Sequence, residues 1–303
     1  MKKLLLLFLL VLVASSCANR EAVKPMNTDK SKTYRVGLGM MEKHALYNRG
    51  FTFQLQEGEP FRPSIQILNE MPETNTFELY FLLDYKQTAV SYGGKQLKTI
   101  RMETAPNGSG QLDVELTGLP AGRHELLLVA VRNPDKPLMT DQLVSPMETY
   151  YYRRATLLIG SDKVTEPAFQ EVAVGQLEGS KVRNVFLTRP KPTSLNDMLK
   201  RFKHEPGSSY DLHFFTRPEV EKYAVTALVN NEQAEQPVHF IRKTERKEGL
   251  ISLPFAFEPP SGRPLSDLTL IVVENPFERI DDESGTYTKI PWMVYFNNKI
   301  TVE

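Results

Sequence analysis

The five histidines of this 303-residue sequence are the first candidates for metal or catalytic chemistry. They are His44, His124, His204, His213 and His239, and no two have the spacing that a zinc site favours on one element. His213 and His239 each stand beside phenylalanine in a strand-like run and could pair across neighbouring strands. A metal would need a third ligand that the sequence does not supply, so we expect no metal site and ordinary surface or edge histidines.

Nucleophilic and phosphate-binding motifs are also missing from the sequence. It contains no G-x-S-x-G elbow, no Ser/His/Asp set that strand order would bring together and no glycine-rich phosphate loop. The densest acidic cluster is Asp281-Asp282-Glu283-Ser284-Gly285, which lacks the alternating oxygen ligands of an EF-hand and is best explained as a solvated turn. We therefore expect no catalytic residues and no cofactor.

Aromatic residues gather in two runs of the sequence. Tyr150, Tyr151 and Tyr152 are consecutive, and Trp292 precedes Tyr295 and Phe296. Neighbours in a strand point to opposite faces, so at least one of the three tyrosines should face outward. Exposed aromatic residues are frequent contact points for partners or sugars, whereas half-buried ones merely brace an edge. Both interpretations remain open from the sequence.

The single cysteine, Cys17, ends an export signal. Lys2 and Lys3 precede an apolar run from Leu4 to Val13, and the small residues 14–16 follow. These are the three regions of a secretory signal peptide. The apolar run is shorter than the roughly 20 residues that a membrane-spanning helix needs. The sequence therefore predicts an exported protein.

The stretch from Val13 to Cys17 resembles the lipobox of bacterial lipoproteins, although Ala14 stands where leucine is usual. The resemblance implies that residues 1–17 are a lipoprotein signal peptide ending at the lipidated Cys17. The protein would then be anchored to the cell membrane or outer membrane and face the extracytoplasmic side. The alternative is a plain secretory peptide cut near Ser16. A lone cysteine cannot form an internal disulfide, which favours lipidation.

Charge balance limits the partners of the chain. The sequence has 37 basic and 37 acidic residues, and loss of Lys2 and Lys3 with the signal leaves a small negative charge. This balance gives no attraction to nucleic acid or to anionic lipid, so we expect no nucleic-acid partner and membrane contact only through the lipid. Residues 18–33 are polar and predict a flexible tether.

Alternation of apolar and polar residues dominates the chain beyond the tether. The apolar positions of the first half fall in three runs, which are Phe51, Phe53 and Leu55; Phe77, Leu79, Phe81 and Leu83; and Leu112, Val114 and Leu116. Period-2 alternation predicts strands with one buried face. Gly93-Gly94 and Asn107-Gly108 tolerate positive φ and predict tight hairpins.

The second half of the chain repeats features of the first. LLLVAVRNP at Leu126–Pro134 matches LTLIVVENP at Leu268–Pro276, 142 residues later. Each run follows a Gly/Pro turn, and Tyr150–Ile159 resembles Tyr295–Val302 with Arg153 matching Asn297. Several matches in one order at nearly constant offset indicate a tandem duplication. The alternative is that all β proteins share such patterns.

These patterns predict a mainly β fold of two tandem β-sandwich domains, similar to immunoglobulin-like or fibronectin-like modules. The domains would span residues 34–160 and 181–303, with residues 161–180 as the linker. One short amphipathic helix is expected in the second domain. Its apolar residues are Leu195, Met198, Leu199 and Phe202, behind Thr193 or Ser194 as the N-cap.

Three functions fit this architecture. The first is a non-catalytic binding or assembly module whose sandwich edges or loops contact an envelope protein or a glycan. The second is an envelope-anchored enzyme with an unrecognised site in the inter-domain groove, and the third is a structural spacer. The resemblance in fold licenses no activity, and the sequence does not choose among them.

Overall fold

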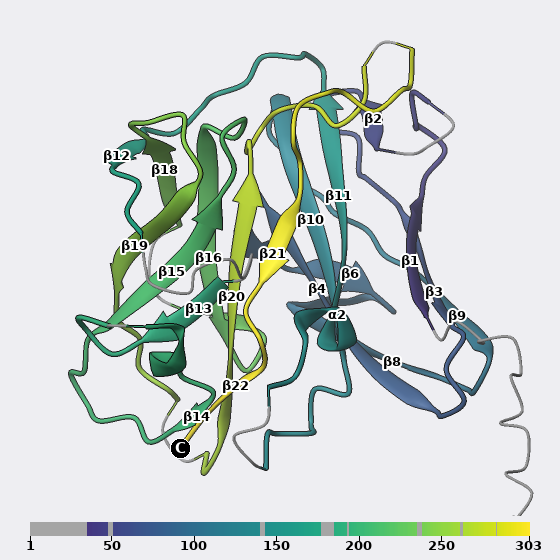
Figure 1. The fold of residues 1–303 in the computed structure, drawn as a ribbon. Helices are drawn as coiled ribbons and strands as arrows, with labels where there is room; N and C mark the ends of the chain where they lie inside the picture. The colour runs from purple at the N-terminus through teal and green to yellow at the C-terminus, as the bar shows by residue number, and fades with distance from the viewer. Residues whose placement is uncertain are drawn as a thin grey trace, which may run out of the picture. The chain divides into compact units, whose positions relative to one another are not determined.

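The computed structural model describes residues 35–47, 51–139, 143–176, 185–192, 194–234, 238–260, 263–282 and 284–303. The predicted signal peptide and tether, with Cys17, lie outside these residues. Arg35–Glu303 form one unit. Its fold is mainly β and of the sandwich kind, as the alternation predicts (Figure 1).

The first half of the unit contains two main sheets and one hairpin. Sheet I has the strand order β1 (Val36–Met41), β3 (Ser64–Asn69), β9 (Gly108–Asp113). Sheet II has the order β2 (Thr52–Leu55), β11 (Tyr150–Ile159), β10 (Gly122–Arg132), β4 (Asn75–Leu83), β5 (Lys86–Thr88), and β8 (Thr99–Thr104) also pairs with β4. The hairpin joins β6 (Val90–Tyr92) to β7 (Lys95–Leu97). A one-turn helix, α2 (Pro146–Thr149), precedes β11.

The second half contains the remaining two sheets. Sheet III has the order β12 (Gln170–Val172), β18 (His239–Lys243), β16 (Lys222–Val229), β20 (Ser266–Glu274), β22 (Ile300–Val302), β14 (Arg201–Phe202). Two short strands join it, β17 (Glu232–Gln233) on β16 and β21 (Val294–Phe296) on β20. Sheet IV has the order β13 (Val185–Thr188), β15 (Tyr210–Thr216), β19 (Gly249–Phe255).

Three hydrophobic cores hold these sheets in four layers. One core lies between sheets I and II, a second between sheets III and IV, and a third between sheets II and III. Successive residues of β4 alternate between two of these cores: Phe77 and Phe81 face sheet I, whereas Tyr80 faces sheet III. The predicted single buried face is therefore wrong for β4, because sheet III covers its other side.

The two halves match in their turns as well as in their strands. Asn133 and Asn275, each followed by proline, have positive φ of 49° and 42°. The backbone N–H of each asparagine donates to the strand beside it, Asn133 to Thr76 and Asn275 to Lys222. Asparagine is one of the few residue types that adopt this conformation readily, which explains why it closes both strands.

Contacts across the middle core follow the same symmetry. The backbone N–H of Gln87 donates to the side chain of Gln233 at 2.8 Å, and the N–H of Gln233 donates to the side chain of Gln87 at 2.8 Å. The two residues are 146 positions apart and lie in the second strands of equivalent hairpins, β4–β5 and β16–β17. Such reciprocal bonding is typical of a two-fold interface between identical subunits, and here it occurs within one chain.

Each half also reaches into the other with a buried cation. Arg154 pairs with Glu125 beside it and donates to carbonyl oxygens of the loop after β20. Lys299 pairs with Asp267 at 3.3 Å and donates to the carbonyl of Lys136 in the loop after β10. Both cations thus link their own half of the unit to the opposite half.

Two local predictions are corrected by the structure. Gly93-Gly94 forms the predicted hairpin between β6 and β7, but Asn107, with φ of 51°, joins β8 in sheet II to β9 in sheet I. The turn at Asn107-Gly108 is therefore a crossing between sheets. The residue types determine the conformation of the turn, while long-range pairing decides which strands the turn connects.

The predicted helix over residues 195–202 is a single 3-10 turn, η1 (Leu195–Asp197). Ser194 caps it as predicted, accepting from the N–H of Asn196, whereas the other N-cap candidate, Thr193, lies outside the described residues. Phe202 instead belongs to β14, which pairs with β22. Eight residues are too few for a stable helix, so the pairing with sheet III determines the conformation.

Candidate binding surfaces

Strand β1 forms one end of sheet I (Figure 1). Its six residues include no charge and no proline. Within the described part of the chain, it pairs only with β3 and makes no backbone hydrogen bond on its other side. An uncharged edge of this kind is a template for pairing with another strand.

The register of sheet I identifies the backbone groups on the free side of β1. The N–H of Glu70 donates to the carbonyl of Arg35 at 2.9 Å, which makes these two residues a hydrogen-bonded pair. Antiparallel ladders alternate, so every second residue after Arg35 bonds to β3. The N–H and C=O groups of Val36, Leu38 and Met40 therefore point to the free side.

The outer face of β1 is nearly bare. Gly37, Gly39 and Met41 lie on it, because the alternate side chains enter the first core. A Cβ atom added at Gly37 would lie 3.4 Å from the Cβ of Leu68, so the glycine leaves Leu68 uncovered at 42% exposure. A hollow of about 470 Å³ at the end of the strand is lined by Met41, Glu42, Lys43, Arg62 and Ser64.

The two edge strands of sheet IV are partly covered. In β13, the carbonyl of Leu187 accepts from Leu199, and Val185 pairs with Asn297. In β19, Leu250 exchanges two backbone hydrogen bonds with Gly175. These contacts are ordinary protection against edge-to-edge pairing. β1 lacks such cover among the residues that the structure describes.

Four of the histidines bond to neighbouring side chains. His44 bonds to Glu42 and Glu59, His124 to Asp84 and His204 to Tyr210 and Glu258. His213 lies in sheet IV and His239 in sheet III, so the suggested pairing between them is wrong. The order of the strands places the two histidines in different sheets, which the local sequence pattern could not show. No group of three metal-ligating side chains occurs among the described residues.

His213 takes part in a hydrogen-bond chain that the sequence did not reveal. The hydroxyl of Thr188 donates to the carbonyl of Arg189 at 2.7 Å, so it accepts from His213 Nε2 at 2.9 Å. His213 Nδ1 then accepts from the hydroxyl of Ser252 at 2.7 Å. Burial lowers the pKa of His213, which agrees with a neutral ring. The third member is a threonine, not the carboxylate of a catalytic triad.

The acidic cluster divides into two environments. Asp281 is fully buried and accepts a hydrogen bond from the hydroxyl of Thr52. Asp282 is exposed and accepts from the N–H groups of Ser284 and Thr286, which makes a tight turn. The interpretation as a solvated turn is therefore right for Asp282 and wrong for Asp281, while Glu283 lies outside the described residues.

The aromatic runs separate in a similar way. Tyr150 is buried and stacks on Phe296 with ring centroids 4.9 Å apart, so it braces the middle core. Trp292 instead approaches Tyr287 and Phe51 at 5.5 and 5.9 Å. Tyr287 is 44% exposed, and this second group of rings reaches the surface.

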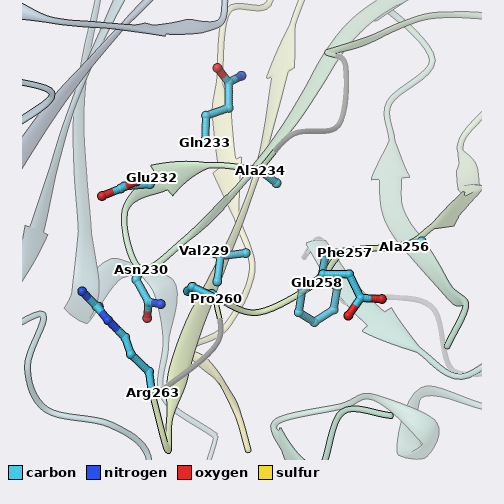
Figure 2. A pocket seen from close by; sticks show the side chains of 10 residues that line it. All are labelled: Val229, Asn230, Glu232, Gln233, Ala234, Ala256, Phe257, Glu258, Pro260 and Arg263. Atoms are coloured by element: carbon cyan, nitrogen blue, oxygen red, sulfur yellow. The ribbon is translucent and has the colours of Figure 1, made fainter. Parts of the chain in front are cut away.

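Ionisable groups line several hollows of the described residues, among them His44, Glu57 and Glu59 around one of about 920 Å³. Figure 2 shows a hollow of about 740 Å³ in the second half, where Glu232 and Glu258 point in opposite directions. Another hollow, of about 500 Å³, lies where the two halves meet. Its walls include Phe240 and Phe277, and Asp84 lies at the same hollow. A typical active site has polar groups that converge on one point.

Comparisons with known proteins do not identify the chain. No protein-family model and no curated protein matches it. Among solved structures, the chaperone DraB of E. coli covers 89% of this chain and 96% of its own at 10% identity, with a TM-score of 0.25. Red sea bream transglutaminase shares 13% identity over 89% of this chain, which spans 31% of the enzyme, with a TM-score of 0.24. The serine protease VesC of Vibrio cholerae shares 7% identity over 89% of this chain, which spans 51% of the protease, with a TM-score of 0.26.

TM-scores this low do not relate the chain to any of these proteins.

Among the helices of the described residues, none is long and apolar enough to cross a membrane.

Proposed function

We propose that the chain is an exported, lipid-anchored binding module that takes up an extended strand of a partner protein along β1. The observation that carries the proposal is the free side of this edge strand, where no described residue bonds to the backbone of Val36, Leu38 or Met40. Strand addition gives affinity through main-chain hydrogen bonds and specificity through pockets for alternate side chains.

The outer face of β1 should make binding selective for the side chains of the partner strand. A bulky side chain of the added strand would lie over Gly37 or Gly39. It would contact Leu68, which is exposed because neither glycine has a side chain to cover it. Aromatic side chains commonly cover edge glycines in this way. The hollow beside Met41 offers a place for a further side chain. We expect partner strands that alternate bulky apolar residues with polar ones.

The lipid on Cys17 would hold this module at a membrane surface. Two or three acyl chains make anchoring stable, whereas a single chain is marginal. Replacing Cys17 by serine removes the thiol that takes the lipid, so we expect Cys17→Ser to stay unprocessed or to leave the membrane fraction. Normal processing and unchanged membrane association of this variant would contradict the anchor.

Proline at residue 38 tests strand addition directly. Leu38→Pro removes the N–H on the free side and leaves the ladder with β3 intact, and Gly37 before it avoids the usual clash. Leu38→Ala is the matched control, because it removes the same side chain and keeps the N–H. Peptides would first be selected on the wild-type protein from a phage-displayed library of random octapeptides.

The proposal predicts peptides that bind the wild type and Leu38→Ala but bind Leu38→Pro at least about tenfold more weakly, equivalent to one or two hydrogen bonds. Circular dichroism of both variants would establish that they fold. Selection of no peptide, or of peptides that bind Leu38→Pro and Leu38→Ala equally, would contradict the proposal.

The structural spacer is the alternative that one further observation favours. The reciprocal bonds of Gln87 and Gln233 and the buried cations Arg154 and Lys299 fix the two halves to each other. A spacer needs such rigidity but no free edge. A protein that is indifferent to Leu38→Pro in every binding assay would fit this alternative.

A further inference from the structure

Sheet IV carries a serine and a histidine side by side on its outer face. Ser252 of β19 and His213 of β15 lie directly opposite each other, and Phe186 of β13 completes the row. The residues on either side of them in these strands enter the second core, so this row points the other way. Ser252 is exposed, whereas His213 and Phe186 are only 2% and 1% exposed. Ser252 is therefore the member of this row that a molecule from solution can reach.

The hydrogen bonds of His213 direct its basic nitrogen at the serine. Thr188 uses its own proton for the carbonyl of Arg189, so His213 Nε2 carries the ring proton and donates to Thr188 at 2.9 Å. His213 Nδ1 keeps its lone pair and accepts from the Ser252 hydroxyl at 2.7 Å. Phe186 stacks on the imidazole with ring centroids 4.9 Å apart, which holds the ring in this orientation. A base placed in this way can take the proton of a nucleophilic serine.

The electrostatic surroundings of His213 suit proton transfer. Burial lowers the pKa of the ring, while the negative charge of Asp211 opposes this shift. The lowered pKa keeps the imidazole neutral near pH 7, so Nδ1 is free to accept a proton. Asp211 lies two residues away on the same face of β15, where its charge would stabilise the imidazolium that forms.

The backbone of Ser252 supplies a hydrogen-bond donor at the same position. Leu250 exchanges two hydrogen bonds with Gly175 on the side of β19 that faces away from β15. Backbone groups alternate along an antiparallel ladder, so those of Ser252 and Pro254 point to this side as well. Pro254 has no N–H to leave unpaired there, and no described residue accepts from the N–H of Ser252. This N–H can bond to a negatively charged oxygen that develops beside the Ser252 hydroxyl.

We infer that Ser252 is a nucleophile that takes an acyl group from a carboxylic ester, with His213 as its base. The Ser252 oxygen attacks the ester carbonyl while its proton moves to His213 Nδ1, and the carbonyl oxygen, now negative, bonds to the N–H of Ser252. The bond from the carbonyl carbon to the alcohol oxygen then breaks, and the alcohol leaves with the proton from Nδ1. Water releases the acyl group from Ser252 as a carboxylic acid by the same proton transfers.

The composition of this site favours an ester over an amide as its substrate. Thr188 orients the imidazole without adding the negative charge that the aspartate of a catalytic triad adds. The N–H of Ser252 is one donor, whereas the oxyanion hole of a serine protease has two. An amine is a poorer leaving group than an alcohol, so cleavage of an amide would need more stabilisation than these groups supply.

A fluorophosphonate tests the nucleophile, because it bonds covalently to a serine oxygen that a neighbouring base activates. The full chain would be treated with an excess of the reagent, and intact mass and peptide mapping would locate the product. We expect one phosphonyl group on Ser252, with loss of fluoride. Ser252→Ala should take up none, and His213→Gln should react at least about a hundredfold more slowly, because a general base contributes at least this factor.

Ser109→Ala is the matched control, since Ser109 is also exposed on an edge strand but lies opposite Leu68 instead of a histidine. It should react as the wild type does, and circular dichroism would establish that every variant folds. A wild type that takes up no phosphonyl group, or takes it up at residues other than Ser252, would overturn the inference. So would equal rates for the wild type and a folded His213→Gln.

Ester hydrolysis is measured separately by release of p-nitrophenol from p-nitrophenyl acetate. The wild type and Ser109→Ala should release it faster than Ser252→Ala, which sets the background of other nucleophiles. Phosphonylation of Ser252 without this difference would contradict acyl transfer.

The inference is independent of strand addition at β1, and the variants separate the two. Leu38→Pro should lose peptides and keep the reaction with the fluorophosphonate. Ser252→Ala should lose the reaction and keep peptides. A variant in one place that removes both properties would contradict two separate sites.

Discussion

At the scale of single residues, buried charges contribute to fixing the relation between the two halves. Arg154 is fully buried and bonds to Glu125 and to carbonyl oxygens of Glu274, Asn275 and Trp292. A buried ion pair is costly to desolvate, but removing one partner leaves the other charge unpaired in the interior. The pair therefore specifies one arrangement of the halves.

Arg154→Met should accordingly lower the free energy of unfolding by about 3–5 kcal/mol, because Glu125 loses its partner. Urea unfolding measures this. Arg62→Met is the control, since Arg62 pairs with Glu115 on the surface at 58% exposure and should change stability little. Equal midpoints for the two variants would contradict the importance of the buried pair.

His124 gives stability a defined pH dependence. Its hydrogen bond to Asp84 raises the pKa of the imidazole above its ordinary value. A group whose pKa is raised on folding stabilises below its unfolded pKa, near 6.5, and loses this effect as pH rises through the folded pKa.

His124→Gln should therefore be less stable than the wild type at about pH 5.5, and the difference should shrink by about pH 8.5. Thermal unfolding of both proteins across this range measures the effect. A difference that stays constant, or that grows with pH, would contradict the assigned contact.

At the scale of elements, the sequence predicted the strands better than their surroundings. Alternation placed Phe53, Phe77 and Leu79 correctly in the first core. It could not show that β10 is buried on both faces, although the unbroken apolar run Leu126–Val131 is typical of such a strand. The helix over residues 195–202 failed because pairing of β14 with β22 overrides a short local pattern.

The second buried face of β10 is open to measurement. Leu126 faces the first core and Leu127 the middle core, and neither has solvent exposure. Truncation of either to alanine should cost about 2–5 kcal/mol, since each leaves a cavity. Chemical denaturation of both variants tests this. A loss for Leu127→Ala far below that for Leu126→Ala would mean that the outer face of sheet II is exposed.

At the scale of the whole molecule, the arrangement of the halves depends on contacts that no local pattern reports. The repeat near Leu126 and Leu268 was visible in the sequence, but the reciprocal bonds of Gln87 and Gln233 join residues 146 positions apart. The sequence could not predict the free side of β1 either, because a strand's position at the edge of a sheet depends on how all the strands of that sheet pair. The lipid anchor at Cys17 stays a prediction from the sequence.

The shared middle core should make the two halves unfold together. Sheets II and III bury apolar residues of both halves, so separating the halves would expose that area to water. We expect one calorimetric transition whose van't Hoff enthalpy equals its calorimetric enthalpy. Two separate transitions would mean that each half is stable without the other.

Strand addition at β1 is tested most directly by amide hydrogen exchange of residues 36–41, followed by NMR with and without a selected octapeptide. The amides of Val36, Leu38 and Met40 point to the free side and should exchange more slowly in the complex. Those of Gly37 and Gly39 already bond to β3 and should change little. This alternating protection is the predicted result, and exchange that slows at none of these residues, or at all of them equally, would contradict strand addition.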